Sequence, residues 1–264
     1  MKLIYASALL LFAACNSADK NAETTTSMSM SGAYNILSTS VKGDSTDTTY
    51  TSGHQLKIYT DGYMMYANIN SPDSISGFGI GSYTSSKDTV TENVIFNAFD
   101  SSYNDKAESF QLAIEKTDKG YKQVINDMVA NNGQHFRLTE TYDSVGTGAK
   151  TALDGAWKQV KQYQIKGKDT VTGTGTQYKT YYAGHVIWGH TWADSLKKNH
   201  TGIGFGKFEL KDNKVKESMT ASTYAQVRGK NFDIDIEMNG TDEFKQTMNN
   251  ADGSKSVEVY QRLK

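Results

Sequence analysis

The sequence repeats itself once over most of its length. Residues 31–145 align with residues 154–264 with only small gaps. The clearest shared signature is GFGIGSY at 77–83 and GIGFGKF at 202–208, where glycine occupies alternate positions in both copies. A repeat of about 120 residues is longer than the roughly 20 to 50 residues of a solenoid unit and has the size of one whole domain. The chain therefore consists largely of two copies of one domain.

Two charged residues recur at matching positions of the copies. Lys57 corresponds to Lys179, and Glu92 corresponds to Glu217. If both side chains point inward, such a pair can orient the head group of a ligand. Ordinary surface charges retained through the duplication are the alternative. The sequence leaves both interpretations open.

The charge balance excludes several classes of partner. Lysine and arginine number 28 against 29 aspartate and glutamate residues, which gives a net charge of -1. The chain carries neither the basic footprint of a nucleic-acid-binding protein nor a polybasic segment for anionic lipid. With 23 glycines, 16 tyrosines and one proline, the composition is typical of β-strands joined by tight turns. We therefore expect no nucleic-acid partner, and any ligand must be held by shape.

The first 14 residues have the pattern of a signal peptide. Lys2 precedes an apolar run at 3–12 that is too short to span a bilayer, and two alanines lead to Cys15, the only cysteine. This segment resembles the lipobox of bacterial lipoproteins, in which the cysteine becomes the lipidated first residue. The resemblance implies a lipid anchor in a Gram-negative cell envelope, and Asn16 favours the outer membrane. An ordinary leader that contains a cysteine is the alternative, although Cys15 has no disulfide partner within the chain.

The second copy shows the strand pattern most clearly. Phe232, Ile234 and Ile236 alternate with acidic residues, which is the period of two of a half-buried strand. Turn signals recur at short spacing, and no helical period lasts longer than two turns. We predict eight strands in this copy, near 155–164, 176–183, 185–192, 202–210, 214–224, 230–238, 243–249 and 255–263.

Consecutive strands joined by hairpins close most readily into an up-and-down barrel. The first copy has the same pattern, so we predict an all-β chain of two tandem eight-stranded antiparallel barrels. The two domains span 31–146 and 154–264, and a lipidated flexible tether at 15–30 precedes them. Because each copy carries a full set of strands, we expect separate cores, with few contacts across the joint near 147–153.

The ends of the second copy resemble those of lipocalins. Gly155-Ala156-Trp157 opens the first predicted strand, and Arg262 lies near the end of the last. In that family the arginine covers the tryptophan and closes one end of the barrel, so the resemblance implies that Arg262 stacks on Trp157. The first copy has Tyr34 and Ser144 at these positions, so its closure must differ. The whole chain is similar to lipocalin-like lipoproteins of Gram-negative bacteria.

The two glycine runs do not have the context of a phosphate-binding loop. No helix follows either run, and no Lys-Ser/Thr pair completes a Walker pattern. Glycine at alternate positions of a strand removes the side chains from one face, which permits tight curvature or close approach of another segment. We interpret both runs as architectural.

Catalytic and metal-binding motifs are absent from the sequence. The chain has neither His-Glu-x-x-His nor Gly-x-Ser-x-Gly. No two of its five histidines have metal-ligand spacing on a helix; these are His54, His135, His185, His190 and His200. A haem site, by analogy with small haem barrels, needs one inward histidine, for which His190 is the candidate; a hydrogen-bonded or exposed histidine is the alternative. We expect no cofactor, no metal and no enzymatic activity.

Three hypotheses for the function follow. The first is a binding protein whose second barrel holds a small apolar or aromatic ligand. Its predicted lining consists of Tyr178, Tyr182, Trp188, His190 and Trp192, with Lys179 and Glu217 available for a head group. The second is a structural or interaction module with barrels filled by their own side chains. The third is an enzyme with Glu217 or His190 as proton-transfer group. A void inside the barrel separates the first hypothesis from the second, and an enzyme also needs a perturbed acid or base in that void.

Overall fold

The structure is a computed structural model that describes residues 28–43, 47–51, 54–69, 76–99, 102–129, 133–146 and 148–264. Every regular element in these residues is a β-strand. In this part of the chain no helix has the length and apolar character needed to cross a membrane. The predicted signal peptide, Cys15 and most of the tether lie outside the described residues.

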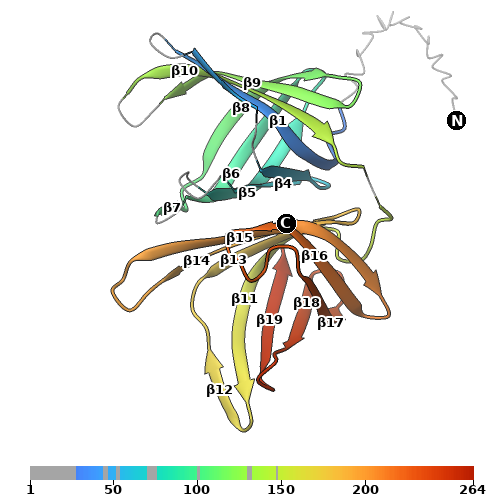
Figure 1. The fold of residues 1–264 in the computed structure, drawn as a ribbon. Helices are drawn as coiled ribbons and strands as arrows, with labels where there is room; N and C mark the ends of the chain where they lie inside the picture. Colours follow the sequence, from blue (N-terminus) through green and yellow to red (C-terminus); the bar gives the residue numbers. More distant parts are fainter. Residues whose placement is uncertain are drawn as a thin grey trace, which may run out of the picture.

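The first copy forms a closed antiparallel barrel (Figure 1). Its strands are β1 (Gly32–Gly43), β3 (Gln55–Tyr59), β4 (Tyr63–Asn68), β5 (Gly77–Ser85), β6 (Thr89–Phe99), β8 (Glu108–Lys116), β9 (Gly120–Val129) and β10 (His135–Ser144). Each pairs with the next, and β10 pairs back with β1. The short strands β2 (Asp47–Tyr50) and β7 (Ser102–Asn104) pair antiparallel with β1 and β6.

The second copy forms a barrel of the same topology. Its strands are β11 (Gly155–Lys166), β13 (Thr176–Tyr182), β14 (His185–Ala193), β15 (Asn199–Lys211), β16 (Lys214–Ser222), β17 (Asn231–Asn239), β18 (Glu243–Asn249) and β19 (Lys255–Arg262), and β19 closes on β11. The predicted all-β fold of two tandem eight-stranded up-and-down barrels is therefore confirmed. The sequence did not predict β12 (Asp169–Thr172), whose residues are all exposed and so lack an alternating pattern.

Trp157 and Arg262 lie together at one end of the second barrel. Their backbones are directly opposite in the β11–β19 pair, and the guanidinium carbon lies 4.0 Å from the centre of the indole ring. Trp157 is fully buried, and its Nε1 donates to the Leu153 carbonyl at 2.7 Å. The guanidinium also donates to the carbonyl oxygens of Ala152, Asp154 and Thr241. This end of the barrel is therefore closed by packing and hydrogen bonds together.

The first barrel is closed differently at the same end. Tyr34 lies opposite Ser144 in the β1–β10 pair, so no guanidinium covers the ring. The Tyr34 hydroxyl donates to the Met30 carbonyl at 3.0 Å, as Trp157 does to Leu153 in the second barrel. The Tyr34 ring also meets the Tyr121 ring edge-on at 4.9 Å. Tyrosine contacts thus replace the cation–π pair of the second barrel.

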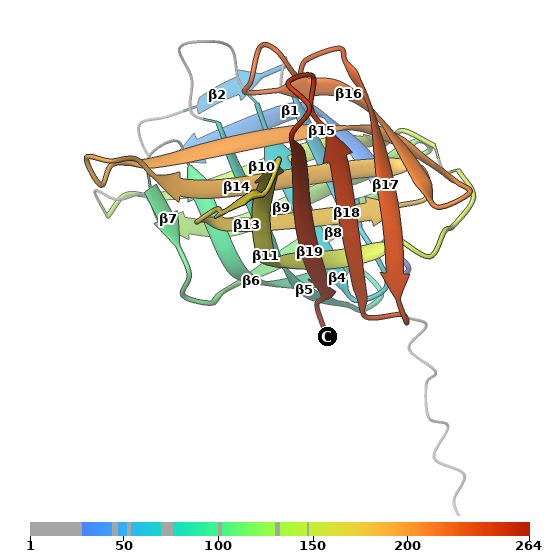
Figure 2. The ribbon, with the colours of Figure 1, turned by 90° about the horizontal axis from the view of Figure 1, so that it is seen from below.

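An apolar cluster joins the two barrels. β3, β4 and β5 of the first barrel face β13, β14 and β15 of the second (Figure 1 and Figure 2). The cluster comprises Ala33, Leu56, Ile58, Met65, Ala67, Ile69, Phe78, Ile80, Phe96 and Ala98 from the first barrel, and Ala156, Tyr178, Tyr182, Ala183, Ile187, Ile203 and Phe205 from the second. The expectation of few contacts between the copies is wrong, because strands such as β3 and β13 are buried on both faces. The exact domain bounds stay a prediction.

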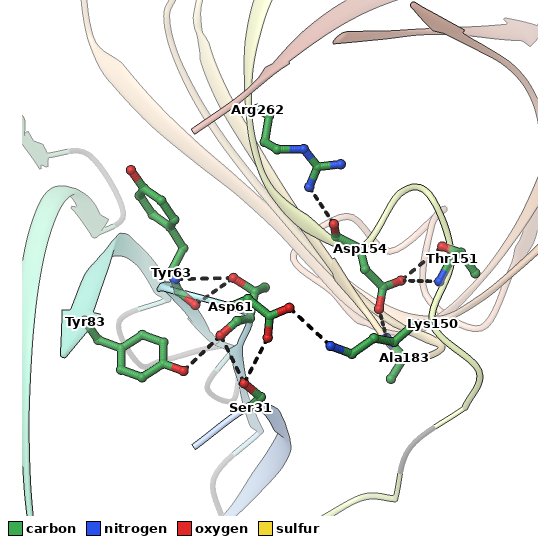
Figure 3. A network of polar contacts seen from close by, with 10 residues as sticks. Ser31, Asp61, Tyr63, Tyr83, Lys150, Thr151, Asp154, Ala183 and Arg262 are labelled. Atoms are coloured by element: carbon green, nitrogen blue, oxygen red, sulfur yellow. Dashed lines mark hydrogen bonds and ion pairs between the residues drawn. The ribbon is translucent and has the colours of Figure 1, made fainter. Parts of the chain in front are cut away.

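Polar contacts hold the chain where it passes between the barrels (Figure 3). The Lys150 ammonium lies 3.2 Å from an Asp61 carboxylate oxygen of the first barrel and 5.1 Å from the centre of the Tyr182 ring of the second. Asp154 accepts hydrogen bonds from Thr151 and from the Ala183 backbone N–H. The joint is therefore tied to both barrels.

Candidate functional site

A cluster of buried polar side chains lies inside the second barrel. We call it the polar cluster; it consists of Gln177, Lys179 and Tyr181 on β13, Glu217 on β16, Gln246 on β18, and Glu258 and Tyr260 on β19. These residues share the inner face of the barrel because alternate side chains of a strand point to the same side. Each is buried, so each must find its hydrogen-bond partners within the protein or a ligand.

Lys179 and Glu217 form the ion pair of the polar cluster. The Lys179 Nζ lies 3.0 Å from Glu217 Oε1, and their side chains are 4% and 5% exposed. The ammonium also donates to Gln246 Oε1 at 3.0 Å and contacts the Tyr181 hydroxyl at 3.3 Å. Burial, followed by the charge of Glu217, raises the pKa of Tyr181 well above its usual value. Tyr181 therefore stays neutral and donates to Glu217 Oε1 at 2.5 Å.

Glu258 is held by neutral donors. Its Oε2 accepts from Gln246 Nε2 at 2.6 Å, from the Tyr260 hydroxyl at 2.5 Å and from Gln177 Nε2 at 3.3 Å. In the described part of the chain, no lysine, arginine or histidine nitrogen lies within 4.0 Å of its carboxylate. A second carboxylate is therefore buried in the barrel without an ion-pair partner of its own.

The first barrel contains the same cluster at matching positions. It consists of Gln55, Lys57, Tyr59, Glu92, Gln123, Glu140 and Tyr142. Lys57 and Glu92 lie 2.7 Å apart with side chains 3% and 6% exposed. Both repeated Lys–Glu pairs thus point inward, and the alternative of ordinary surface charges is wrong. The other cluster members were missed, although Gln-x-Lys-x-Tyr and Glu-x-Tyr occur in both copies.

A cavity of about 220 Å³ adjoins the polar cluster in the second barrel. Gln177, Lys179, Glu217, Gln246 and Glu258 form its polar side. The remaining lining residues are Gln162, Trp188, His190, Met219, Tyr224, Val227, Phe232, Ile234 and Met248. A largely apolar wall with a few convergent polar groups is the usual composition of a small-molecule site.

Three of the four aromatic rings that line this cavity contact one another; Phe232 is the fourth. The Trp188 and Tyr224 rings are nearly parallel, with centres 6.1 Å apart. His190 Nε2 lies 2.7 Å from the Tyr224 hydroxyl, and the two form a hydrogen bond. Burial lowers the pKa of His190 to about 4, so its imidazole is neutral at neutral pH.

The glycine run of β15 makes room for these rings. A Cβ on Gly204 would lie 2.4 Å from the Trp188 indole, and a Cβ on Gly202 would lie 2.2 Å from His190 Nε2. Gly206 differs because it lies at a β-bulge, where a Cβ would be 2.1 Å from the Ser218 carbonyl oxygen. The first two glycines of the run therefore leave space for rings that line the cavity, and the third permits the close approach of a neighbouring backbone.

We expect Gly206→Ala to destabilise the protein more than Gly204→Ala. The first substitution pushes against backbone atoms and should lower the free energy of unfolding by about 1 to 3 kcal/mol, as overpacking does. The second can be relieved by movement of the Trp188 ring, so it should chiefly alter tryptophan fluorescence. Urea denaturation and emission spectra of the two variants measure both effects. Equal destabilisation with unchanged fluorescence would contradict these different roles of Gly204 and Gly206.

Comparison with known proteins gives little further information. No protein-family model matches the chain, and neither does any curated protein sequence. Among solved structures, the chain is similar to a protein of unknown function from the DUF3598 family of Nostoc punctiforme. The two share 10% sequence identity with a TM-score of 0.27, over 88% of this chain and 96% of that chain. A similarity this low carries no argument about function.

The structure brings four of the seven predicted ligand-binding residues to the cavity: Lys179, Trp188, His190 and Glu217. The expectation that Tyr178 and Tyr182 line the interior is wrong, because both belong to the apolar cluster between the barrels. The two-residue turn at 183–184 places Tyr182 opposite His185, and this register places Lys179 opposite Trp188. Tyr178 and Tyr182 therefore point outward.

The remaining histidines and Trp192 lie away from the polar cluster. Trp192 packs on the rings of His190 and His200, with centres 4.8 and 5.3 Å away, and is not part of the cavity lining. His185 is buried near the β13–β14 turn, and burial lowers its pKa. Among the described residues, no group of three or more His, Cys, Asp or Glu side chains has a geometry that could hold a metal ion.

Proposed function

We propose that this chain is a binding protein whose second barrel holds a small aromatic ligand. The observation that carries the proposal is the cavity of about 220 Å³ that is lined by residues of the polar cluster and by aromatic rings. An apolar cavity of about 150 Å³ engineered into another protein takes up benzene. This cavity therefore suits a single ring with a short polar arm. Its empty volume favours a ligand over the alternative of a barrel filled by its own side chains.

We expect the full chain to bind at least one of three single-ring probes: phenethylamine, phenethyl alcohol or phenylacetate. Binding to the folded state should raise the melting temperature with probe concentration and change the fluorescence of Trp188, which lines the cavity. Val227→Trp should abolish both responses because it fills the cavity from a half-buried lining position.

Val160→Trp is the matched control. Val160 lies on β11 of the same barrel and is 49% exposed, so the same added ring leaves the cavity open. Loss of binding in Val227→Trp alone supports the proposed site. If no probe binds the parent chain, the filled-barrel alternative replaces the proposal.

We also propose that the protein is anchored to the cell envelope, at the outer membrane, through a lipid on Cys15. The support is the apolar leader that ends in small residues and the only cysteine of the chain. Cys15→Ser should leave an unlipidated protein that fractionates as soluble, whereas the parent partitions into detergent. Leu196→Ser, at a residue 86% exposed in the second barrel, is the control and should remain with the membrane. Membrane partitioning of Cys15→Ser equal to the parent would contradict the anchor.

A further inference from the structure

Within the polar cluster the ammonium has a partner for every donor, whereas each carboxylate has one oxygen without a donor. Lys179 has three acceptors, on Glu217, Gln246 and Tyr181. Glu217 receives both of its donors on Oε1, and Glu258 receives all three of its donors on Oε2. The other oxygens, Glu217 Oε2 and Glu258 Oε1, accept nothing from the described chain. Both oxygens keep some solvent-accessible surface, and both residues line the cavity.

The charges facing the cavity are also unbalanced. Two carboxylates are present against the single ammonium of Lys179. Gln246 separates that ammonium from Glu258, because its carbonyl accepts from Lys179 and its amide donates to Glu258. A buried charge is costly unless it is paired, so the surplus carboxylate favours a cation in the cavity.

The aromatic residues of the lining fit the same chemistry. Trp188 and Tyr224 present the rings of a stacked pair, and aromatic faces attract an ammonium or guanidinium group. His190 adds no positive charge there, because burial keeps its pKa near 4, far below neutral pH. An anionic ligand would instead have to displace one of the three protein acceptors of Lys179.

We infer that the ligand of the second barrel carries a cationic head group, an amine or guanidine, bound by the free oxygens of Glu217 and Glu258. This inference rests on the proposed ligand-binding function and adds the chemical class of the ligand. The head group donates hydrogen bonds to the two carboxylates and supplies the positive charge that the polar cluster lacks. The apolar part of the ligand lies against Trp188, Tyr224 and Met219.

The test compares the three probes, which share one ring and one arm and differ in charge. Isothermal titration of the full chain should give phenethylamine an affinity about tenfold to a hundredfold above that of phenethyl alcohol, as expected for hydrogen bonds between charged groups. Phenylacetate should bind more weakly than the alcohol. Glu258→Gln, which keeps the shape and an acceptor oxygen, should reduce the amine-to-alcohol ratio to near one while the alcohol still binds.

Glu140→Gln is the matched control, because Glu140 occupies the place of Glu258 in the first barrel. It should leave the amine-to-alcohol ratio unchanged, and an equal loss in this variant would overturn the assignment to the second barrel. Alcohol or acetate binding as tight as the amine in the parent would overturn the cationic head group and leave the binding function standing. The parent measurements decide this even if Glu258→Gln does not fold. Failure of all three probes to bind would overturn both proposals.

Discussion

Replacing Trp157 with alanine should lower the free energy of unfolding by about 3 to 5 kcal/mol, the range for deletion of a buried tryptophan. Trp157 is fully buried and meets the Phe244 ring edge-on with centres 4.7 Å apart. Its Nε1 donates to the Leu153 carbonyl, which holds the segment before β11 across the end of the barrel. The substitution therefore leaves a cavity and one orphaned carbonyl. Urea denaturation followed by circular dichroism measures the change.

Arg262→Ala should destabilise the protein several times less. Its cation–π contact with Trp157 contributes roughly 0.5 to 2 kcal/mol depending on desolvation. Of the three carbonyls that it leaves behind, those of Ala152 and Thr241 lie near the surface, within reach of water, and that of Asp154 is half-buried. A double-mutant cycle isolates the contact. Effects that add within about 0.3 kcal/mol would show that the two side chains do not interact. Tyr34 and Ser144 of the first barrel form the control cycle, because they share this register without a cation.

The strands and the closure of the second barrel can be predicted from the sequence, because local residue patterns determine them. Phe232, Ile234 and Ile236 alternate with acidic residues, and the structure places them on β17 as predicted. The closing pair follows from the resemblance to lipocalins, which implies that Arg262 stacks on Trp157, and the structure has this contact. What makes these features predictable is that neighbouring residues, or one shared motif, determine them.

The predicted lining by Tyr178 and Tyr182 implies the wrong register of β13 against β14, although the turn determines that register. A two-residue hairpin at 183–184 pairs Tyr182 with His185, and counting outward pairs Lys179 with Trp188. Grouping Tyr178 and Tyr182 with Trp188 shifts this pairing by one residue, and a shift of one moves every side chain to the opposite face. The correct lining was therefore available from the sequence.

The contact between the barrels and the burial of the polar cluster could not be predicted from the sequence. β13 is buried on both faces, and a strand pattern does not say which surface covers the outer one. Gln177 and Lys179 stand on either side of Tyr178, just as solvent-facing residues alternate with buried ones. Only the closed barrel shows that these side chains point to the interior, because the polarity of a residue does not tell which face of the strand is buried.

Lys179→Met should lower the free energy of unfolding by about 3 to 5 kcal/mol, the usual effect of removing one partner of a buried ion pair. The substitution leaves Glu217 and Glu258 as two buried carboxylates with no cation inside the barrel. The double variant Lys179→Met/Glu217→Gln should recover a large part of the loss, because it removes the charge that lost its partner. Lys245→Met is the control, since its ion pair with Glu237 is solvent-exposed and contributes about 0 to 1 kcal/mol.

The loss in Lys179→Met should also depend on pH in a defined direction. Without the ammonium, the negative charge of Glu217 is buried without a partner, and protonation of the carboxylate removes that cost. The destabilisation should therefore be greatest at neutral pH, where the carboxylate is charged, and should shrink at acidic pH as the carboxylate takes up a proton. Urea denaturation of the parent and the variant at neutral and acidic pH measures this difference. A loss independent of pH would mean that Lys179 acts through packing of its alkyl chain and not through its charge.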